Sequence, residues 1–78
     1  MDYRHVFATN LRRLRAEKGY SQEALAHEAS VNRTYLSKLE KGSSFAGLEL
    51  MVKLAKVLQV EPADFLKVPP RKPRRPGR

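Results

Sequence analysis

The sequence of 78 residues predicts an all-α fold of five short helices, followed by a disordered basic C-terminal arm. Apolar residues recur at spacings of three and four, which place them on one face of a helix. Residues that start and stop helices separate these segments. No segment alternates polar and apolar residues, no hairpin dipeptide such as Asn-Gly occurs, and no internal repeat is visible. The sequence therefore predicts helices packed on helices, without a sheet.

The first predicted helix runs from Asp2 or Tyr3 to Lys18. Its inner face is expected to hold Tyr3, Phe7, Leu11 and Leu14. Gly19 follows as a left-handed cap, because glycine adopts this conformation without steric cost.

Two short helices are predicted next, over residues 21–29 and 32–41, with a tight turn between them. Ser21 and Asn32 are expected to cap their N-termini by accepting from free backbone N–H groups. Leu25, Ala26 and Ala29 of the helix over residues 21–29 are expected to face Leu36 and Leu39 of the helix over residues 32–41. Gly42 ends the latter helix. Ala26 is small, as the crossing point of two such closely joined helices requires.

The remaining elements are a fourth helix over residues 48–58 and a fifth that begins at Pro62, where proline suits the first helical position. The expected apolar side of the fourth helix holds Met51, Val52, Ala55, Leu58 and Leu48, with Leu54 beside them. Four prolines and five basic residues fill residues 69–78. The predicted organisation is one domain over residues 1–67 and a flexible Pro/Arg-rich tail over residues 68–78.

Composition excludes several classes of function. A chain this short buries only about 60% of the surface that it exposes when unfolded, so a deep enclosed cleft is not expected. There is no cysteine, which fits a reducing cytosol, and charged residues interrupt the first twenty positions, so no signal peptide or membrane span is expected. The serines lack His and Asp partners, and His5 and His27 lie 22 residues apart with no ligand cluster. We expect a cytoplasmic protein that is not an enzyme, needs no cofactor and has no membrane partner.

The net charge of +8 is unevenly distributed. Residues 1–66 hold ten Lys or Arg and eight Asp or Glu, whereas residues 67–78 hold six Lys or Arg and no acid. A basic balance favours nucleic acid or an anionic surface as partner. The tail is expected either to follow a phosphate backbone or to act as a solubilising segment.

Beyond the pattern of residues 21–42, several segments resemble the phage repressor and Cro type of helix-turn-helix, the XRE family, over nearly all of residues 3–66. These segments are Leu11-Arg12-Arg13-Leu14-Arg15 with Lys18-Gly19, Leu39-Glu40-Lys41-Gly42, Leu48-Glu49, and Leu54-Ala55-Lys56-Val57-Leu58. The compact format and Asn32-Arg33-Thr34-Tyr35 are also similar to controller proteins of restriction-modification systems. The resemblance implies a compact five-helix repressor-like domain that binds double-stranded DNA.

The resemblance also implies that the third helix enters the major groove. The expected base-reading residues are Arg33, Thr34, Ser37 and Lys38. The expected phosphate contacts are Gln22, Asn32, Tyr35, Lys41, Ser43 and Ser44. Asn32 is expected to act first as a cap, and Tyr35 either binds phosphate or packs between helices.

Glu40 places an anion in the last turn of a helix, against the helix dipole, and therefore needs a cation. The resemblance pairs it with Arg15 as a structural salt bridge, and the alternative is a solvated surface carboxylate. Ser30 and Gln59 stand where the family frequently has glycine, which is costly if the backbone there is left-handed.

The apolar arc of the fourth helix is wider than a core requires. We expect a homodimer whose interface includes Leu50, Val57, Phe65 and Leu66, since small helix-turn-helix domains usually bind paired half-sites. The alternative is that the fifth helix covers these residues.

The sequence thus predicts a sequence-specific, dimeric transcriptional regulator of a bacterial or phage-like kind, nucleoid-associated, that represses or activates from a palindromic operator. The alternative is an antitoxin-like module that binds a protein partner as well as its operator. RNA binding ranks third, because no aromatic stacking platform is evident.

Overall fold

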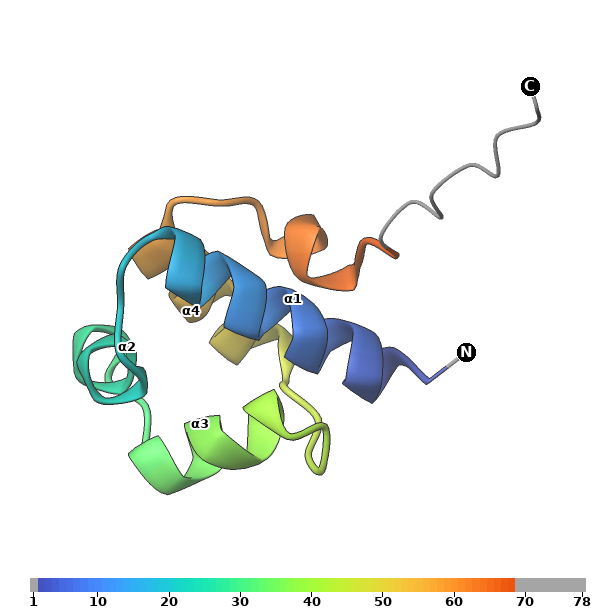
Figure 1. Cartoon of the computed structure of the whole chain (residues 1–78), viewed down its shortest axis with the longest axis horizontal. Helices are drawn as coiled ribbons and strands as arrows, with labels where there is room; N and C mark the ends of the chain where they lie inside the picture. The colour runs from blue at the N-terminus through green and yellow to red at the C-terminus, as the bar shows by residue number, and fades with distance from the viewer. Residues whose placement is uncertain (1, 69–78) are drawn as a thin grey trace, which may run out of the picture.

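The computed structural model describes residues 2–68, which form four α-helices and one short 3₁₀-helix and contain no strand (Figure 1). The elements are α1 (Tyr3–Glu17), α2 (Gln22–Ala29), α3 (Arg33–Glu40), α4 (Leu48–Leu58) and η1 (Pro62–Leu66). The all-α prediction is confirmed. The fifth element differs, because η1 is a single five-residue 3₁₀ segment that ends in extended backbone at Lys67. The predicted flexible tail lies outside the described residues, except for its first residue, Val68.

Local side-chain contacts explain where the helices begin. The side chains of Asp2, Ser21 and Asn32 accept hydrogen bonds from the backbone N–H groups two or three residues further on, at 3.0–3.1 Å. Each bond satisfies one of the donors that a helix N-terminus leaves free. These contacts set the starts of α1, α2 and α3.

Two helices end in left-handed residues that are not glycine. Ser30 follows α2 with φ 56°, and Gln59 follows α4 with φ 58°. A Cβ atom in this conformation lies too close to the following carbonyl oxygen, at a cost of roughly 1–2 kcal/mol. The cost foreseen at these two positions is therefore present in the backbone.

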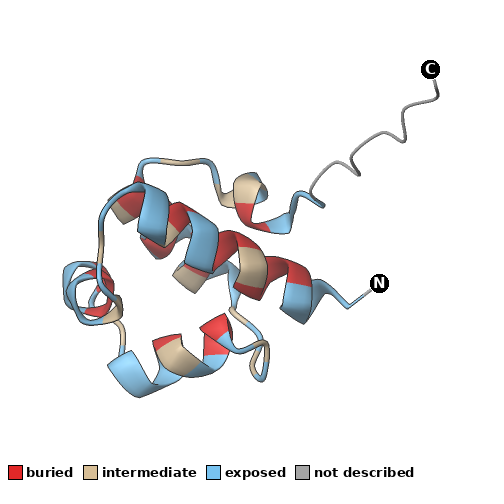
Figure 2. Ribbon diagram, in the orientation of Figure 1, coloured by how far each residue is buried: buried red, intermediate tan, exposed pale blue. Residues whose placement is uncertain are grey.

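The core lies between α1, α4 and the inner sides of the other elements, as the buried segments in Figure 2 show. α1 packs against α3 and η1, while α2 packs against α3 and α4. The rings of Phe7 and Phe65 meet at 5.2 Å with a tilt of 58°, a favourable edge-to-face type of contact. The main buried cluster is Phe7, Leu11, Leu14, Leu25, Ala26, Ala29, Leu36, Leu39, Met51, Leu54, Ala55, Leu58 and Phe65.

Three residues that the helical spacing predicted to face inward are exposed instead: Tyr3, Leu48 and Val52. Tyr3 lies in the first turn of α1, and Leu48 and Val52 lie one turn apart on the flank of α4. The core face of α4 is narrower than predicted and consists of Met51, Leu54, Ala55 and Leu58. No element among residues 2–68 covers the flank that holds Leu48 and Val52.

Asn10 anchors the C-terminal segment to α1. Its side chain is buried, and its Nδ2 donates to the carbonyl oxygens of Phe65 at 2.8 Å and Lys67 at 2.9 Å. Beside it, the Lys67 ammonium 2.9 Å from Asp64, together with the backbone N–H of Glu61, lowers the pKa of the Asp64 carboxyl from its ordinary value. The two hydrogen bonds of Asn10 hold η1 against α1, where the ring of Phe65 meets that of Phe7. The sequence analysis did not single out Asn10.

Candidate nucleic-acid interface

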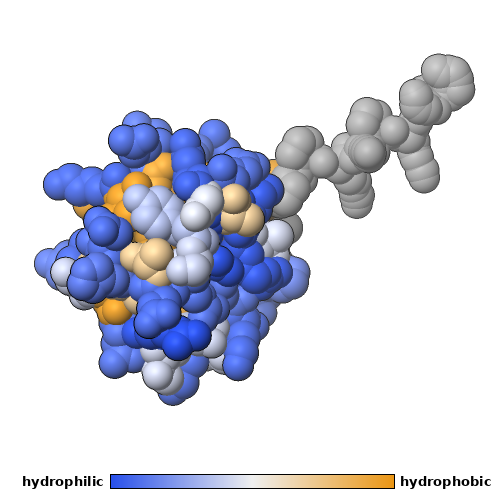
Figure 3. Space-filling model, turned by 60° about the vertical axis from the view of Figure 1, so that its left-hand side comes forward, coloured by the Kyte–Doolittle hydropathy of each residue, from blue (hydrophilic) through white to orange (hydrophobic). Residues whose placement is uncertain are grey.

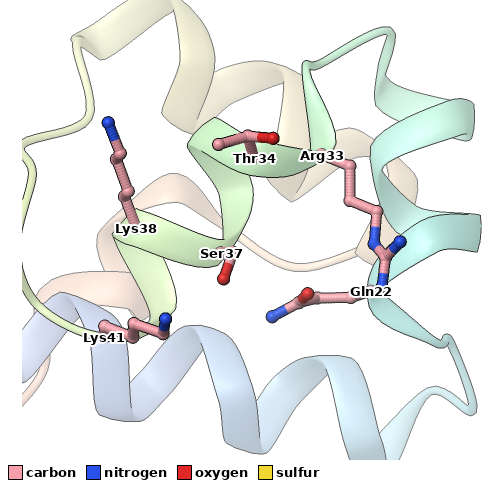
Figure 4. Close-up of a pocket in the computed structure, with 6 residues that line it drawn as sticks. All are labelled: Gln22, Arg33, Thr34, Ser37, Lys38 and Lys41. Atoms are coloured by element: carbon pink, nitrogen blue, oxygen red, sulfur yellow. The ribbon is translucent and has the colours of Figure 1, made fainter.

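An open hollow of about 310 Å³ lies between the start of α2 and the outer face of α3 (Figure 4). Three cations and no acid line it, and Arg33 reaches from the start of α3 toward Gln22 at the start of α2. The lining residues are Gln22, Arg33, Thr34, Ser37, Lys38 and Lys41. The hollow is therefore polar, electropositive and open to solvent.

The helical period explains why these residues share one face. Arg33, Ser37 and Lys41 follow one another at intervals of four, and Thr34 and Lys38 run beside them. Leu36 and Leu39 point the other way and are fully buried. The structure thus brings together all four predicted base-reading residues with two predicted phosphate contacts, Gln22 and Lys41.

The other predicted phosphate contacts have different surroundings. Asn32 caps α3 through its side-chain oxygen, and Ser43 Oγ donates to the carbonyl oxygen of Lys38 at 3.2 Å. The Tyr35 hydroxyl donates to the carbonyl oxygen of Phe45 in the loop after α3. Ser44 lies away from α3, against a second hollow. Tyr35 was expected either to bind phosphate or to pack between helices. In the structure its hydroxyl makes a hydrogen bond within the domain, and its side chain is partly exposed.

Glu40 is held by a network at the back of the reading face. Its side chain is 4% exposed, and Arg15 donates to it from Nε at 2.6 Å and from Nη2 at 3.0 Å. Gln22 Nε2 donates a third bond at 3.1 Å, and Arg15 also donates to the carbonyl oxygen of Tyr20 at 2.9 Å. Because Glu40 is buried, a solvated surface carboxylate does not describe it. The network ties α1, α2 and α3 together.

Arg12 adds a second link between α1 and α3, which the sequence analysis did not assign. Its guanidinium donates to the backbone carbonyl of Glu40. A cation at this end of a helix satisfies a free carbonyl group and complements the helix dipole. Arginines on successive turns of α1 therefore fix the end of α3, one through the main chain and one through the Glu40 carboxylate.

The four residues predicted for a dimer interface differ in their surroundings. Leu50 and Val57 are partly buried and pack against the core, and Leu66 is exposed. Phe65 is fully buried. Its assignment to an interface is corrected, because a side chain without exposed surface cannot touch a second copy.

The surface on the side of α2 is largely hydrophilic, with hydrophobic residues confined to small areas (Figure 3). His5 and His27 are both exposed, and residues 2–68 contain no group of three or more His, Asp or Glu side chains arranged to hold a metal ion. None of the helices described is both long and apolar enough to cross a bilayer.

Two short helices joined by the three residues 30–32, the second with a buried inner face and a basic outer face, define a helix-turn-helix of the DNA-binding class. The helix-turn-helix family model HTH_3 matches residues 11–65, and the chain belongs to this family. The resemblance noted in the sequence is confirmed. The chain is a DNA-binding regulator of the helix-turn-helix type.

The similar proteins include controllers of restriction-modification systems. The control protein C.BamHI from Bacillus amyloliquefaciens is 39% identical over 64 residues, which cover 81% of this chain and 79% of that protein. The structure of the controller protein C.AhdI from Aeromonas hydrophila superposes with a TM-score of 0.76 at 37% identity, covering 80% of this chain and 94% of that one. A hypothetical transcription factor, NHTF, from Neisseria superposes with a TM-score of 0.83 at 38% identity, covering 87% of this chain and 78% of that one.

Proposed function

We propose that the chain regulates transcription by placing the outer face of α3 in the major groove of a specific DNA duplex. The observation that carries this proposal is the electropositive hollow on α3, where three cations and two hydroxyl groups share one face of a helix that is fixed from behind. B-DNA admits one α-helix into its major groove, where each base pair presents a distinct pattern of donors and acceptors.

Each side chain of this face suits a particular contact. Arg33 and Lys38 can donate to the O6 and N7 atoms of guanine. The Thr34 methyl group can touch a thymine methyl group, while its hydroxyl and that of Ser37 can bond either kind of base edge. These four residues are the proposed readers of sequence.

The proposed phosphate contacts surround these readers. Gln22 lies in the first turn of α2, whose N-terminus also favours an anion, and one hydrogen of its amide group is engaged by Glu40 while the other is free to donate. Lys41 lies at the other end of the hollow. Asn32 is exposed beside this face, and its amide hydrogens can donate because only its side-chain oxygen makes the cap. Tyr35 and Ser43 are exposed there too and complete the proposed set, each exchanging its hydroxyl hydrogen bond within the domain for one to phosphate. Ser44 is left out, because it lies on a different hollow.

A homodimer on a palindromic operator is the proposed binding form, since two copies of a helix-turn-helix read half-sites about 34 Å apart. The relatives that control restriction-modification systems favour a regulator of that kind, acting in the cytoplasm on the nucleoid. The alternative antitoxin-like role predicts instead a second protein that co-purifies with the chain in stoichiometric amount.

The test is a selection from random duplex DNA with the full chain, followed by Arg33→Ala and Lys38→Ala. Each variant is expected to lose preference at particular base pairs and about 1–3 kcal/mol of binding free energy for the selected duplex. Lys53→Ala is the matched control, because Lys53 is an exposed lysine on α4 outside the hollow. No enrichment of any sequence, or equal losses for Lys53→Ala and Lys38→Ala, would contradict the proposal.

A further inference from the structure

The guanidinium of Arg4, on the first turn of α1, lies over an exposed aromatic ring in the loop after α3. Its Cζ atom is 5.1 Å from the centroid of the Phe45 ring, which is within the range of a cation–π contact. The Arg4 side chain is 43% exposed and Phe45 is 69% exposed. The pair therefore stands at the surface, where both groups can meet a partner.

The donors of the Arg4 guanidinium are largely unused within residues 2–68. Its Nε atom is 3.6 Å from the Asp2 carboxylate, too far for a hydrogen bond, and that carboxylate accepts instead from the backbone N–H of Arg4 at 3.0 Å. An exposed pair at this distance contributes little. A guanidinium carries five N–H donors in one plane, whereas a ring contacts the face of that plane. Donors of Arg4 therefore remain available for a bidentate acceptor such as phosphate.

The pair lies beside the C-terminal end of α3. Lys41, which ends this helix, lines the electropositive hollow. Gly42 follows and approaches α1 so closely that a Cβ atom there would lie 3.8 Å from the Arg4 carbonyl oxygen. The Tyr35 hydroxyl donates to the Phe45 carbonyl oxygen, so α3 also holds the segment that carries the ring. Arg4 borders the second hollow as well and thus adjoins both surfaces, at the start of α1 (Figure 1).

With α3 in the major groove, this end of the helix lies near the DNA backbone. The N-terminal residues of a helix-turn-helix reading helix contact base edges, which leaves its C-terminal end closer to the phosphates. α3 has eight residues and is about 12 Å long, similar to the width of the major groove. Gln22 is the proposed phosphate contact beside one end of α3. Lys41 and Ser43 are proposed at the other end, and Arg4 stands next to them.

We propose that Arg4 binds a DNA phosphate beside the C-terminal end of α3, and that the Phe45 ring positions its guanidinium for this contact. The inference rests on the proposed function, because it requires α3 to lie in the major groove. Arg4 is the residue that touches DNA, and Phe45 is a positioning residue that acts through Arg4. An arginine already held on a ring loses less conformational freedom on binding than a free one, so the ring raises affinity without touching DNA.

The first test measures the affinity of the full chain for the selected duplex at several salt concentrations. Arg4→Gln removes one phosphate contact, so the slope of log affinity against log salt should fall by about 0.9. The ratio of wild-type to variant affinity should then be about three- to fourfold larger at 50 mM than at 200 mM salt, with the preferred sequence unchanged. Circular dichroism verifies that each variant is folded.

Arg13→Gln is the matched control for this measurement. Arg13 is an exposed arginine of α1, about two and a half turns from Arg4 and therefore on the opposite side of the helix. Its charge acts on Asp64 of η1, away from α3. The control should keep the wild-type slope. An Arg4→Gln slope equal to that of the control would overturn the proposal.

The second test asks whether Phe45 acts through Arg4. Phe45→Leu keeps an apolar side chain without the ring and should weaken DNA binding about two- to fivefold, the range of an exposed cation–π contact. Phe45→Tyr keeps the ring and should bind as the wild-type chain does. In the Arg4→Gln background, Phe45→Leu should have no further effect, because the residue that it positions is gone. Additive losses, or a Phe45→Tyr variant as weak as Phe45→Leu, would overturn the positioning role.

The third test locates the phosphate on the selected duplex. Single phosphates are replaced in turn by neutral methylphosphonates, and the affinities of the wild-type chain and Arg4→Gln are compared at each position. At one position the replacement should weaken the wild-type chain and leave Arg4→Gln unchanged. This position should lie on the side of the half-site where Lys38→Ala loses base preference, away from the side where Arg33→Ala does. No such position, or one only on the Arg33 side, would contradict the inference.

These measurements separate the failure of this inference from that of the proposed function. If Arg33→Ala and Lys38→Ala lose base preference while Arg4→Gln behaves like Arg13→Gln, the inference fails and the proposed function stands. If no sequence is enriched, the proposed function fails. A reduced Arg4→Gln slope on a duplex of unrelated sequence would then show that Arg4 contacts phosphate without base reading by α3.

Discussion

Replacing Arg15 by alanine would leave the Glu40 carboxylate buried with most of its partners removed. Glu40 accepts three hydrogen bonds from side chains, and two of them come from the Arg15 guanidinium, at 2.6 and 3.0 Å. Only the amide of Gln22, at 3.1 Å, would remain. Water cannot replace the lost donors without opening the contact between α1 and α3, because the Glu40 side chain is almost fully buried.

The magnitude follows from this geometry. A hydrogen bond to a charged group contributes about 1.5–3 kcal/mol, and removing one partner of a buried ion pair typically costs about 3–5 kcal/mol. Small domains have a free energy of unfolding near the lower end of about 5–15 kcal/mol. Arg15→Ala is therefore expected to remove about half or more of the stability of this domain.

Urea denaturation followed by circular dichroism measures the effect. Glu17→Ala is the control, since it breaks the exposed Arg13–Glu17 pair and should cost no more than about 0.5 kcal/mol. The double variant Arg15→Met with Glu40→Leu replaces both charges by apolar groups and should recover most of the loss. An Arg15→Ala cost below about 1 kcal/mol, or a double variant less stable than Arg15→Ala, would refute this account of the network.

Three further predictions follow from features of the fold. Ser30→Gly and Gln59→Gly, at left-handed positions, should each raise the free energy of unfolding by about 1 kcal/mol in urea denaturation, and a loss at either would show that its side chain makes a compensating contact. Asn10→Leu should lower it by about 2–4 kcal/mol, because the buried carbonyl oxygen of Phe65 and the partly buried one of Lys67 lose their donor, whereas a neutral result would show that water replaces the amide. Deleting residues 69–78, which carry five Lys or Arg, should reduce the slope of log affinity against log salt by as much as about 4 and leave sequence preference intact, and an unchanged slope would exclude phosphate contacts by the tail.

The sequence was sufficient to predict the helix boundaries because the signals that set them are local. Ser21 and Asn32 cap their helices through backbone groups three residues away, so the contact follows from sequence alone. The type of the last helical element, η1, was less predictable. Residues 62–66 carry a proline start typical of a helix, but a single turn can settle as either a 3₁₀ or an α segment, and its packing against Phe7 and Asn10 selects between them.

Periodicity predicts which residues share a helix face but not where the neighbouring element stops. Tyr3, Leu48 and Val52 fit the inward pattern and are nevertheless exposed, because no described element reaches that side of the domain. The opposite error concerns polar side chains that make contacts inside the fold, which the sequence analysis did not identify. Asn10 and Arg12 have side chains of the kind usually found on the surface, and only the approach of η1 and α3 gives them their partners.

For the proposed reading face, the sequence predicted the residues on one side of α3 well, because an eight-residue helix with two buried leucines leaves one outer side. The surroundings of the residues proposed to bind phosphate were harder to predict, since they depend on how the loop after α3 folds. Ser44 lines the second hollow, and the Tyr35 hydroxyl donates to the Phe45 carbonyl oxygen. Neither contact follows from helix periodicity or from the residue types alone.

The attachment of α3 to α1 by two arginines has a consequence for binding thermodynamics. A helix of eight residues would be largely unfolded in isolation, since helices shorter than about 12–15 residues are marginal in water. Here the conformational entropy of α3 is lost when the domain folds, so DNA binding does not incur this cost. Calorimetry of DNA binding should then give a heat-capacity change that accounts for the contact surface alone, without the additional contribution that coupled folding of a recognition element would bring.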